Sequence, residues 1–174
     1  LFNRLAGSEV YAADQLFATL DTTSRRLFLK DAGQSVILSD TVGFIRDLPH
    51  SVVAAFHATL EETANADLLL HVVDAASPDR EEQMAVVNGV LREIGAGDVP
   101  QLLVWNKIDL TQGAAGALED GCGNIDRVLL SARTGDGLDI LRQALAARLF
   151  QPVPPHAQWA GSDQESSPLP ETSD

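Results

Sequence analysis

The sequence predicts a three-layer α/β sandwich built around a mostly parallel β-sheet. Short apolar runs alternate with segments of helical periodicity through about 1–150 of the 174 residues. Two of these runs, 68–73 and 101–105, are almost continuously apolar, which is typical of strands covered on both faces. Beyond this domain, the acidic, Pro- and Ser-rich segment 151–174 is expected to be a disordered tail.

The first predicted strands form a β-hairpin. The apolar runs 25–30 and 35–40 are joined by 31–34, and a four-residue connection that contains glycine favours antiparallel pairing. A helix is expected next, because Pro49 suits a first helical turn. Apolar side chains then repeat at helical spacing, at Val53, Phe56, Leu60 and Ala64.

The second half of the domain should alternate strand and helix. The buried strand at 68–73 precedes a helix over 79–94, whose first turn is acidic as the helix dipole favours. Another buried strand follows at 101–105. Residues 113–123 are small and Gly-rich, and predict at best one weak helix. A last strand is expected at 127–130, and an amphipathic helix then carries Leu138, Leu141, Leu145 and Leu149.

Composition and charge exclude several classes of protein. Twelve Lys and Arg against 25 Asp and Glu give a net charge of −13, so a general nucleic-acid binder is not expected. A shape-specific contact with RNA through a few arginines stays open. No run reaches the length of a membrane span, and residues 1–5 lack the pattern of a signal peptide. The single cysteine, Cys122, excludes an internal disulfide framework. We therefore expect a cytoplasmic protein, and a monomer.

Polar residues follow three of the predicted strands, where α/β proteins bind their ligands. The hairpin ends in Asp40-Thr41-Val42-Gly43. Asp40 can hold Mg²⁺ through a water molecule, and Gly43 lets its backbone N–H approach a phosphate oxygen without a Cβ in the way. A D-x-x-G sequence alone is also typical of an ordinary turn.

The strand at 101–105 ends in Asn106-Lys107-Ile108-Asp109. The Asp109 carboxylate can accept hydrogen bonds from N1 and N2 of guanine, a donor pair that adenine lacks. Sites that depend on a specific hydrogen bond reject the lacking analogue by about 10⁴–10⁵-fold. Asn106 can bridge to neighbouring loops, and the Lys107 stem can lie along the base. This motif therefore favours guanine.

The last strand ends in Ser131-Ala132-Arg133, followed by Thr134-Gly135. Backbone N–H groups of a tight turn here can donate to guanine O6. The triad alone is a weak signal. Together, the three motifs at successive strand ends predict a guanine-nucleotide site.

A loop ahead of the hairpin has the sequence Phe17-Ala18-Thr19-Leu20-Asp21. A hydroxyl on such a loop can ligate Mg²⁺ while its N–H contacts the γ-phosphate, so that hydrolysis releases the loop. On chemistry alone, Thr19, Thr22 and Thr23 compete for this role.

These motifs resemble the HflX family of translation-associated GTPases, which are Obg-HflX-like P-loop proteins. The run from Asp14 to Asp21 is similar to the family's first switch, and that from Asp40 to His50 to its second. The resemblance covers about 1–150, and it implies a Ras-like G domain that binds GTP or GDP with Mg²⁺. It selects Thr19 and, through water, Asp40 as magnesium ligands, and it implies the large (50S) ribosomal subunit as a partner in translation, ribosome rescue or biogenesis. Thr22 departs from the family, which usually has proline there.

The resemblance identifies no catalytic residue. Ras-like GTPases orient the attacking water with a glutamine after D-x-x-G, where this sequence has Phe44. The resemblance implies that the attacking water is positioned in another way, and that GTP turnover is slow until a ribosomal partner binds.

The family's phosphate loop, G-x-x-x-x-G-K-[ST], would end immediately before Leu1 and does not occur in the sequence. We therefore expect an N-terminally truncated fragment that lacks the loop and the first strand, which would lie between the strands ending at Asp40 and Asp74. Residues 1–7 are then the remainder of the first helix. Each lost charge-assisted bond is worth about 1.5–3 kcal/mol, so this chain should bind GTP poorly.

Two alternatives remain. A metal-dependent hydrolase would use His50, His57 and His71 with Asp40 or Asp74, but no H-E-x-x-H spacing occurs, and His71 suits a buried core position. The other is a non-catalytic interaction module derived from a G domain, in which the switch region is only a binding face.

Overall fold

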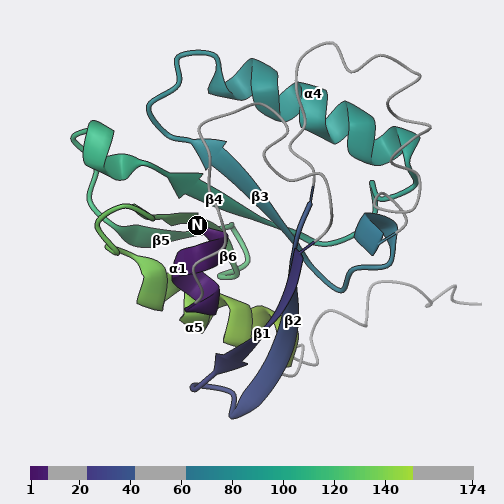
Figure 1. Ribbon diagram of the computed structural model, residues 1–174. Helices are drawn as coiled ribbons and strands as arrows, with labels where there is room; N and C mark the ends of the chain where they lie inside the picture. The colour runs from purple at the N-terminus through teal and green to yellow at the C-terminus, as the bar shows by residue number, and fades with distance from the viewer. Residues whose placement is uncertain (8–22, 42–61, 151–174) are drawn as a thin grey trace, which may run out of the picture.

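The computed structural model describes residues 1–7, 23–41 and 62–150, which form two β-sheets and the helices that cover them (Figure 1). The predicted tail at 151–174 lies outside the described residues. So does most of the helix expected after Pro49, although residues 62–64 are helical, as its C-terminal end should be.

The predicted hairpin is confirmed. Strands β1 (Thr23–Leu29) and β2 (Gln34–Asp40) pair antiparallel, with Leu27 opposite Val36. Leu27 and Leu29 are buried while Phe28 between them is exposed, because successive side chains of a strand point to opposite faces. Helix α1 (Phe2–Ala6) contacts both strands, in agreement with the helix expected at 1–7.

The second sheet contains three parallel strands and one antiparallel edge strand. Strands β3 (Leu69–Asp74), β4 (Gln101–Asn106) and β6 (Ile125–Leu129) are parallel, as predicted. The strand order is β3-β4-β6-β5, and among the described strands the hairpin forms a sheet of its own. The strands β2 and β3, which end at Asp40 and Asp74, are therefore not paired with each other. This agrees with the expectation that a further strand would lie between them.

The weak helix predicted at 113–123 is wrong. This segment contains β5 (Gly116–Glu119), which pairs antiparallel with β6. The turn between them is closed by Asp120, whose Oδ1 accepts the N–H groups of Cys122 at 2.8 Å and Asn124 at 2.9 Å. The N–H groups of Asn124 and Cys122 also lower the pKa of this carboxyl. The four residues Gly116–Glu119 have only a weak intrinsic preference for a strand. Their extended conformation is therefore decided by pairing with β6 and by the turn at Asp120.

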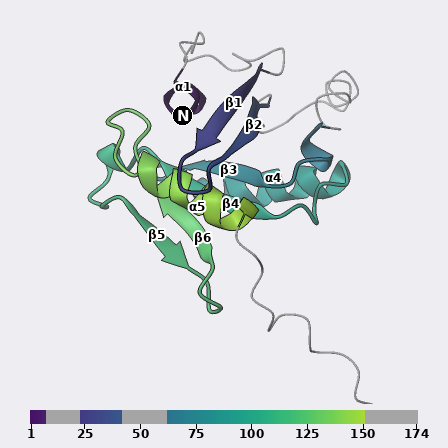
Figure 2. The same cartoon turned by 90° about the horizontal axis from the view of Figure 1, so that it is seen from below.

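Helices cover both faces of the parallel sheet, which confirms the three-layer prediction. Helix α4 (Arg80–Glu93) lies on one face, and α5 (Leu138–Phe150) lies on the other with α1 (Figures 1 and 2). Apolar side chains build the core between α5, the hairpin and the sheet. Its central members are Leu27, Leu29, Leu102, Val104, Val128, Leu130, Leu141 and Leu145. Among the described residues, no helix is both long and apolar enough for a membrane span.

His71 in β3 is a core residue, as predicted. It is buried, and its Nδ1 lies 3.2 Å from Oε1 of Gln101. Burial lowers the pKa of His71 from 6.5, and the hydrogen bond with Gln101 only partly opposes this shift. The neutral ring is therefore the form that suits the folded chain.

This pKa shift predicts a loss of stability in acid. The unfolded chain binds a proton at His71 at higher pH than the folded chain, so stability is complete above about pH 6.5 and falls below it, towards the folded pKa. His71→Gln should flatten this part of the profile. Urea unfolding of both chains from pH 7 to 5 measures the effect, and equal pH dependence in the two would contradict it.

Candidate functional site

Two of the three polar motifs predicted at strand ends, 106–109 after β4 and 131–133 after β6, meet at one edge of the parallel sheet. Asp74 at the end of β3 is in register with Asn106 at the end of β4, and the Ala75 N–H donates to the Asn106 carbonyl at 2.8 Å. The Leu130 N–H, just after β6, donates to the Trp105 carbonyl at 2.9 Å. These backbone bonds fix the relative positions of the following side chains.

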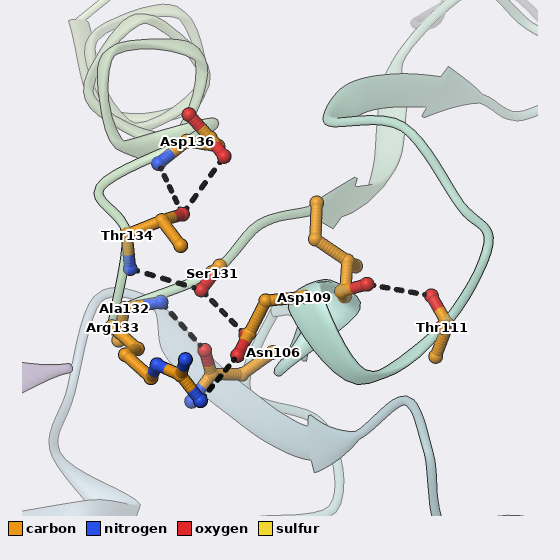
Figure 3. A network of polar contacts seen from close by, with 9 residues as sticks. Asn106, Asp109, Thr111, Ser131, Ala132, Arg133, Thr134 and Asp136 are labelled. Carbon is orange, nitrogen blue, oxygen red and sulfur yellow. Dashed lines mark hydrogen bonds and ion pairs between the residues drawn. The ribbon is translucent and has the colours of Figure 1, made fainter.

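Asn106 bridges two loops, as predicted. Its Oδ1 accepts the backbone N–H of Ala132 at 2.9 Å, and this bond joins the end of β4 to the turn after β6 (Figure 3). The Ile108 N–H donates to the Leu130 carbonyl at 3.3 Å and strengthens the same connection. The two motifs therefore form one unit.

Asp109 lies in the short 3₁₀ helix η1 (Ile108–Leu110), and two residues of the neighbouring turn contact its carboxylate (Figure 3). The hydroxyl of fully buried Ser131 donates to Oδ1 at 2.6 Å. Nη1 of Arg133 lies 3.4 Å from Oδ2. The Asp109 side chain is 13% exposed, and the Ser131 hydroxyl orients its carboxylate from the protein side.

The predicted tight turn follows β6, and it is held by its own polar groups. The Ser131 N–H donates to the Asp136 carbonyl at 2.9 Å, and the Gly135 N–H donates to the Ser131 carbonyl at 2.9 Å. The Thr134 N–H donates to Oγ of Ser131 at 3.1 Å. Within 131–135, all of which the structure describes, the Arg133 N–H is the one with no intramolecular acceptor. Donation to guanine O6 stays a prediction.

Lys107 is held by an acidic residue whose role the sequence did not predict. Its backbone has φ 67°, a left-handed conformation, and its Nζ lies 2.8 Å from Oδ2 of Asp74. Oδ1 of Asp74 also accepts the Ala76 N–H at 3.0 Å. Burial raises the pKa of Asp74, but the Lys107 ammonium and the N–H groups of Ala76 and Ser77 outweigh burial, and the pKa is lower than 3.8. The sequence feature that could have predicted this ion pair is the position of Asp74, a carboxylate at the end of β3, the strand beside β4.

The predicted phosphate and magnesium side is described only in part. Asp40 ends β2 and Thr41 follows it. The switch residues Phe17, Ala18, Thr19, Leu20 and Asp21, with Val42, Gly43 and Phe44, lie outside the described residues.

The described residues contain no group of three His, Cys, Asp or Glu side chains placed to hold a metal ion. The alternative of a metal-dependent hydrolase also needs His50 and His57, which lie outside them.

Comparison with known proteins agrees with this geometry. The family model described as "50S ribosome-binding GTPase" matches residues 1–107. GTPase HflX of Escherichia coli is 54% identical over 157 residues, which are 90% of this chain and 37% of the relative. GTPase HflX of Caldanaerobacter subterraneus is 48% identical over 151 residues, 87% of this chain and 34% of that protein. The chain thus spans about a third of the length of these curated relatives.

Solved structures share the fold. The complex of SsGBP with GDP has a TM-score of 0.60 and 28% identity, and the match covers 83% of this chain and 44% of that one. Era in complex with MgGDPNP and a segment of 16S ribosomal RNA also has a TM-score of 0.60, at 22% identity, over 87% of this chain and 52% of its own. With the family model matched over residues 1–107 and HflX relatives about half identical, the chain belongs to the 50S ribosome-binding GTPases, within them to HflX, and has the P-loop GTPase fold.

Proposed function

We propose that the edge formed by Asn106, Lys107, Asp109 and the turn 131–133 binds the guanine base of GTP and GDP. The observation that carries this proposal is the Asp109 carboxylate, which Ser131 orients at 2.6 Å and which is 13% exposed. An oriented acceptor pair at the carboxyl end of parallel strands suits the N1–H and N2–H donors of guanine.

Asn106 and Lys107 support this carboxylate in different ways. Asn106 holds the turn 131–133 against β4 through its bond with Ala132. Asp74 fixes the Lys107 ammonium beside the strand ends, where the lysine stem can cover the face of a bound base. In this arrangement a base enters between the stem and the Asp109 edge.

Magnesium would be held by Asp40 through water and by Thr19, and it would neutralise phosphate charge. The Asp40 carboxylate, which the structure describes, fits this role. Mg²⁺ usually keeps several waters and takes one or two protein oxygens together with phosphates, so it does not need a site formed only by protein ligands. Phe17, Ala18, Leu20 and Asp21 of the first switch, and Thr41, Val42 and Gly43 of the second, would surround the phosphates.

For the whole protein we propose GTP hydrolysis in association with the large ribosomal subunit, in translation or in ribosome rescue or biogenesis, by a cytoplasmic monomer. The names of the HflX relatives and of the matching family support the GTP hydrolysis and the ribosome association in this proposal. No side chain is assigned to catalysis, and Phe44 cannot orient water as a glutamine does.

The proposal is tested in an HflX chimaera, in which this chain replaces the matching segment of the Escherichia coli relative. Calorimetry with Mg²⁺ should show binding of GDP at least about 10²-fold tighter than of ADP, since adenine lacks the donor pair. Equal affinities would refute the base site.

Hydrolysis of GTP by the same chimaera is then measured with and without large ribosomal subunits. Faster turnover with subunits is the expected result. Binding to subunits without any change in turnover would instead support the non-catalytic interaction module.

A further inference from the structure

Arg133 contacts the part of Asp109 that a base must reach. Ser131 approaches the carboxylate from the protein interior at Oδ1, whereas Nη1 of Arg133 lies 3.4 Å from Oδ2. The Arg133 side chain is 79% exposed and that of Asp109 is 13% exposed. Figure 3 shows Arg133 extending from the turn after β6 to the carboxylate. The guanidinium therefore lies on the solvent side of the acceptor pair.

A guanine base and this guanidinium compete for the same oxygen. The N1–H and N2–H donors of guanine are adjacent and need one carboxylate oxygen each. A carboxylate oxygen accepts about two hydrogen bonds, so Oδ1 can keep the Ser131 hydroxyl and still accept a base donor. The outer side of Oδ2 is different, because Arg133 occupies it.

We infer that Arg133 closes the base-recognition edge of Asp109 when no nucleotide is bound, and that guanine binds by displacing it. This inference rests on the proposed function of the site. Arg133 is thereby a residue that lowers nucleotide affinity, although it belongs to a binding motif.

The geometry sets the size of the effect. The distance of 3.4 Å is longer than the roughly 2.7–2.9 Å of a strong charge-assisted bond, and the arginine is mostly exposed. Exposed ion pairs of this kind change an equilibrium by at most about five-fold. A base that makes two bonds to Asp109 can therefore displace Arg133, and the cost is still measurable.

Arg133→Met in the HflX chimaera removes the charge and keeps an unbranched apolar stem. GDP affinity should rise about two- to five-fold in about 50 mM KCl, and the gain should disappear near 0.5 M KCl, where exposed charges are screened. Arg92→Met is the matched control, because Arg92 is an exposed arginine near the end of α4. It corrects for the general effect of one lost cation on phosphate binding.

A double-mutant cycle isolates the contact. In an Asp109→Asn background, assayed with the xanthine nucleotide XDP, Arg133→Met should have no effect beyond that of Arg92→Met, since no carboxylate is left to release. Weaker GDP binding by Arg133→Met, or an equal change in the two backgrounds, would overturn the inference.

A second measurement needs no nucleotide. The carboxyl ¹³C shift of Asp109 in selectively labelled chimaera should differ between wild type and Arg133→Met at about 50 mM KCl and converge at about 0.5 M. Identical Asp109 shifts in wild type and Arg133→Met at about 50 mM KCl would contradict the inference that Arg133 covers the Asp109 carboxylate. A chimaera that bound no GDP would refute the proposed function and the displacement step, while this shift would still decide whether Arg133 covers Asp109.

Discussion

Asp109→Asn in the HflX chimaera should change the preferred base from guanine to xanthine. The variant loses two charge-assisted hydrogen bonds to guanine, each worth about 1.5–3 kcal/mol, so GDP affinity should fall by about 10²-fold or more. The asparagine amide can donate to the oxygen that xanthine carries in place of the guanine amino group, so XDP affinity should rise. Calorimetry with GDP and XDP in the presence of Mg²⁺ measures both changes.

The fold should tolerate this substitution. The amide oxygen of asparagine can still accept the Ser131 hydroxyl, which now donates to Oδ1 at 2.6 Å. Asp98→Asn is the matched control, because it makes the same chemical change at an exposed position outside the site. A variant that melts like wild type and keeps its preference for GDP would contradict the role assigned to Asp109.

Most of the fold was predictable because apolar periodicity reports which side chains are buried. The hairpin, the parallel strands β3, β4 and β6, and helices α4 and α5 all follow from such patterns. Strand β5 did not, because Gly116–Glu119 is too short to show a period of two. Its conformation depends on the Asp120 turn and on pairing with β6, and neither is visible in composition.

The proximity of the motifs 106–109 and 131–133 was predictable for a topological reason. Parallel strands end at one edge of a sheet, so motifs that follow β4 and β6 must lie close together, and Asn106 and Ala132 do so. The ion pair between Asp74 and Lys107 was missed, because it depends on strand register and on the left-handed backbone at Lys107. The contact between Arg133 and Asp109 is also set by the turn geometry, which a three-residue motif does not report.

Gly137 gives the second large expected effect, because it connects this turn to α5. It has φ 81°, and an added Cβ would lie 2.6 Å from the carbonyl oxygen of Leu129 and 2.9 Å from Cβ of Leu130. Its own carbonyl accepts the Leu141 N–H at 3.0 Å in the first turn of α5. A side chain here must therefore move either the end of β6 or the start of α5.

Gly137→Ala should lower the free energy of unfolding of the chain by about 2–4 kcal/mol, from about 1 kcal/mol of backbone strain and about 1–3 kcal/mol of steric overlap. Gly123→Ala is the matched control, because Gly123 also has φ 81° but has nothing within 4 Å of the added Cβ. Gly123→Ala should lower the free energy of unfolding only by the contribution of backbone strain, about 1 kcal/mol. Urea unfolding of the three chains measures both losses, and equal destabilisation by the two alanines would show that the contact with β6 does not constrain this turn. Because the same turn presents Ser131 to Asp109, Gly137→Ala should also weaken GDP binding in the chimaera, whereas Gly123→Ala should not.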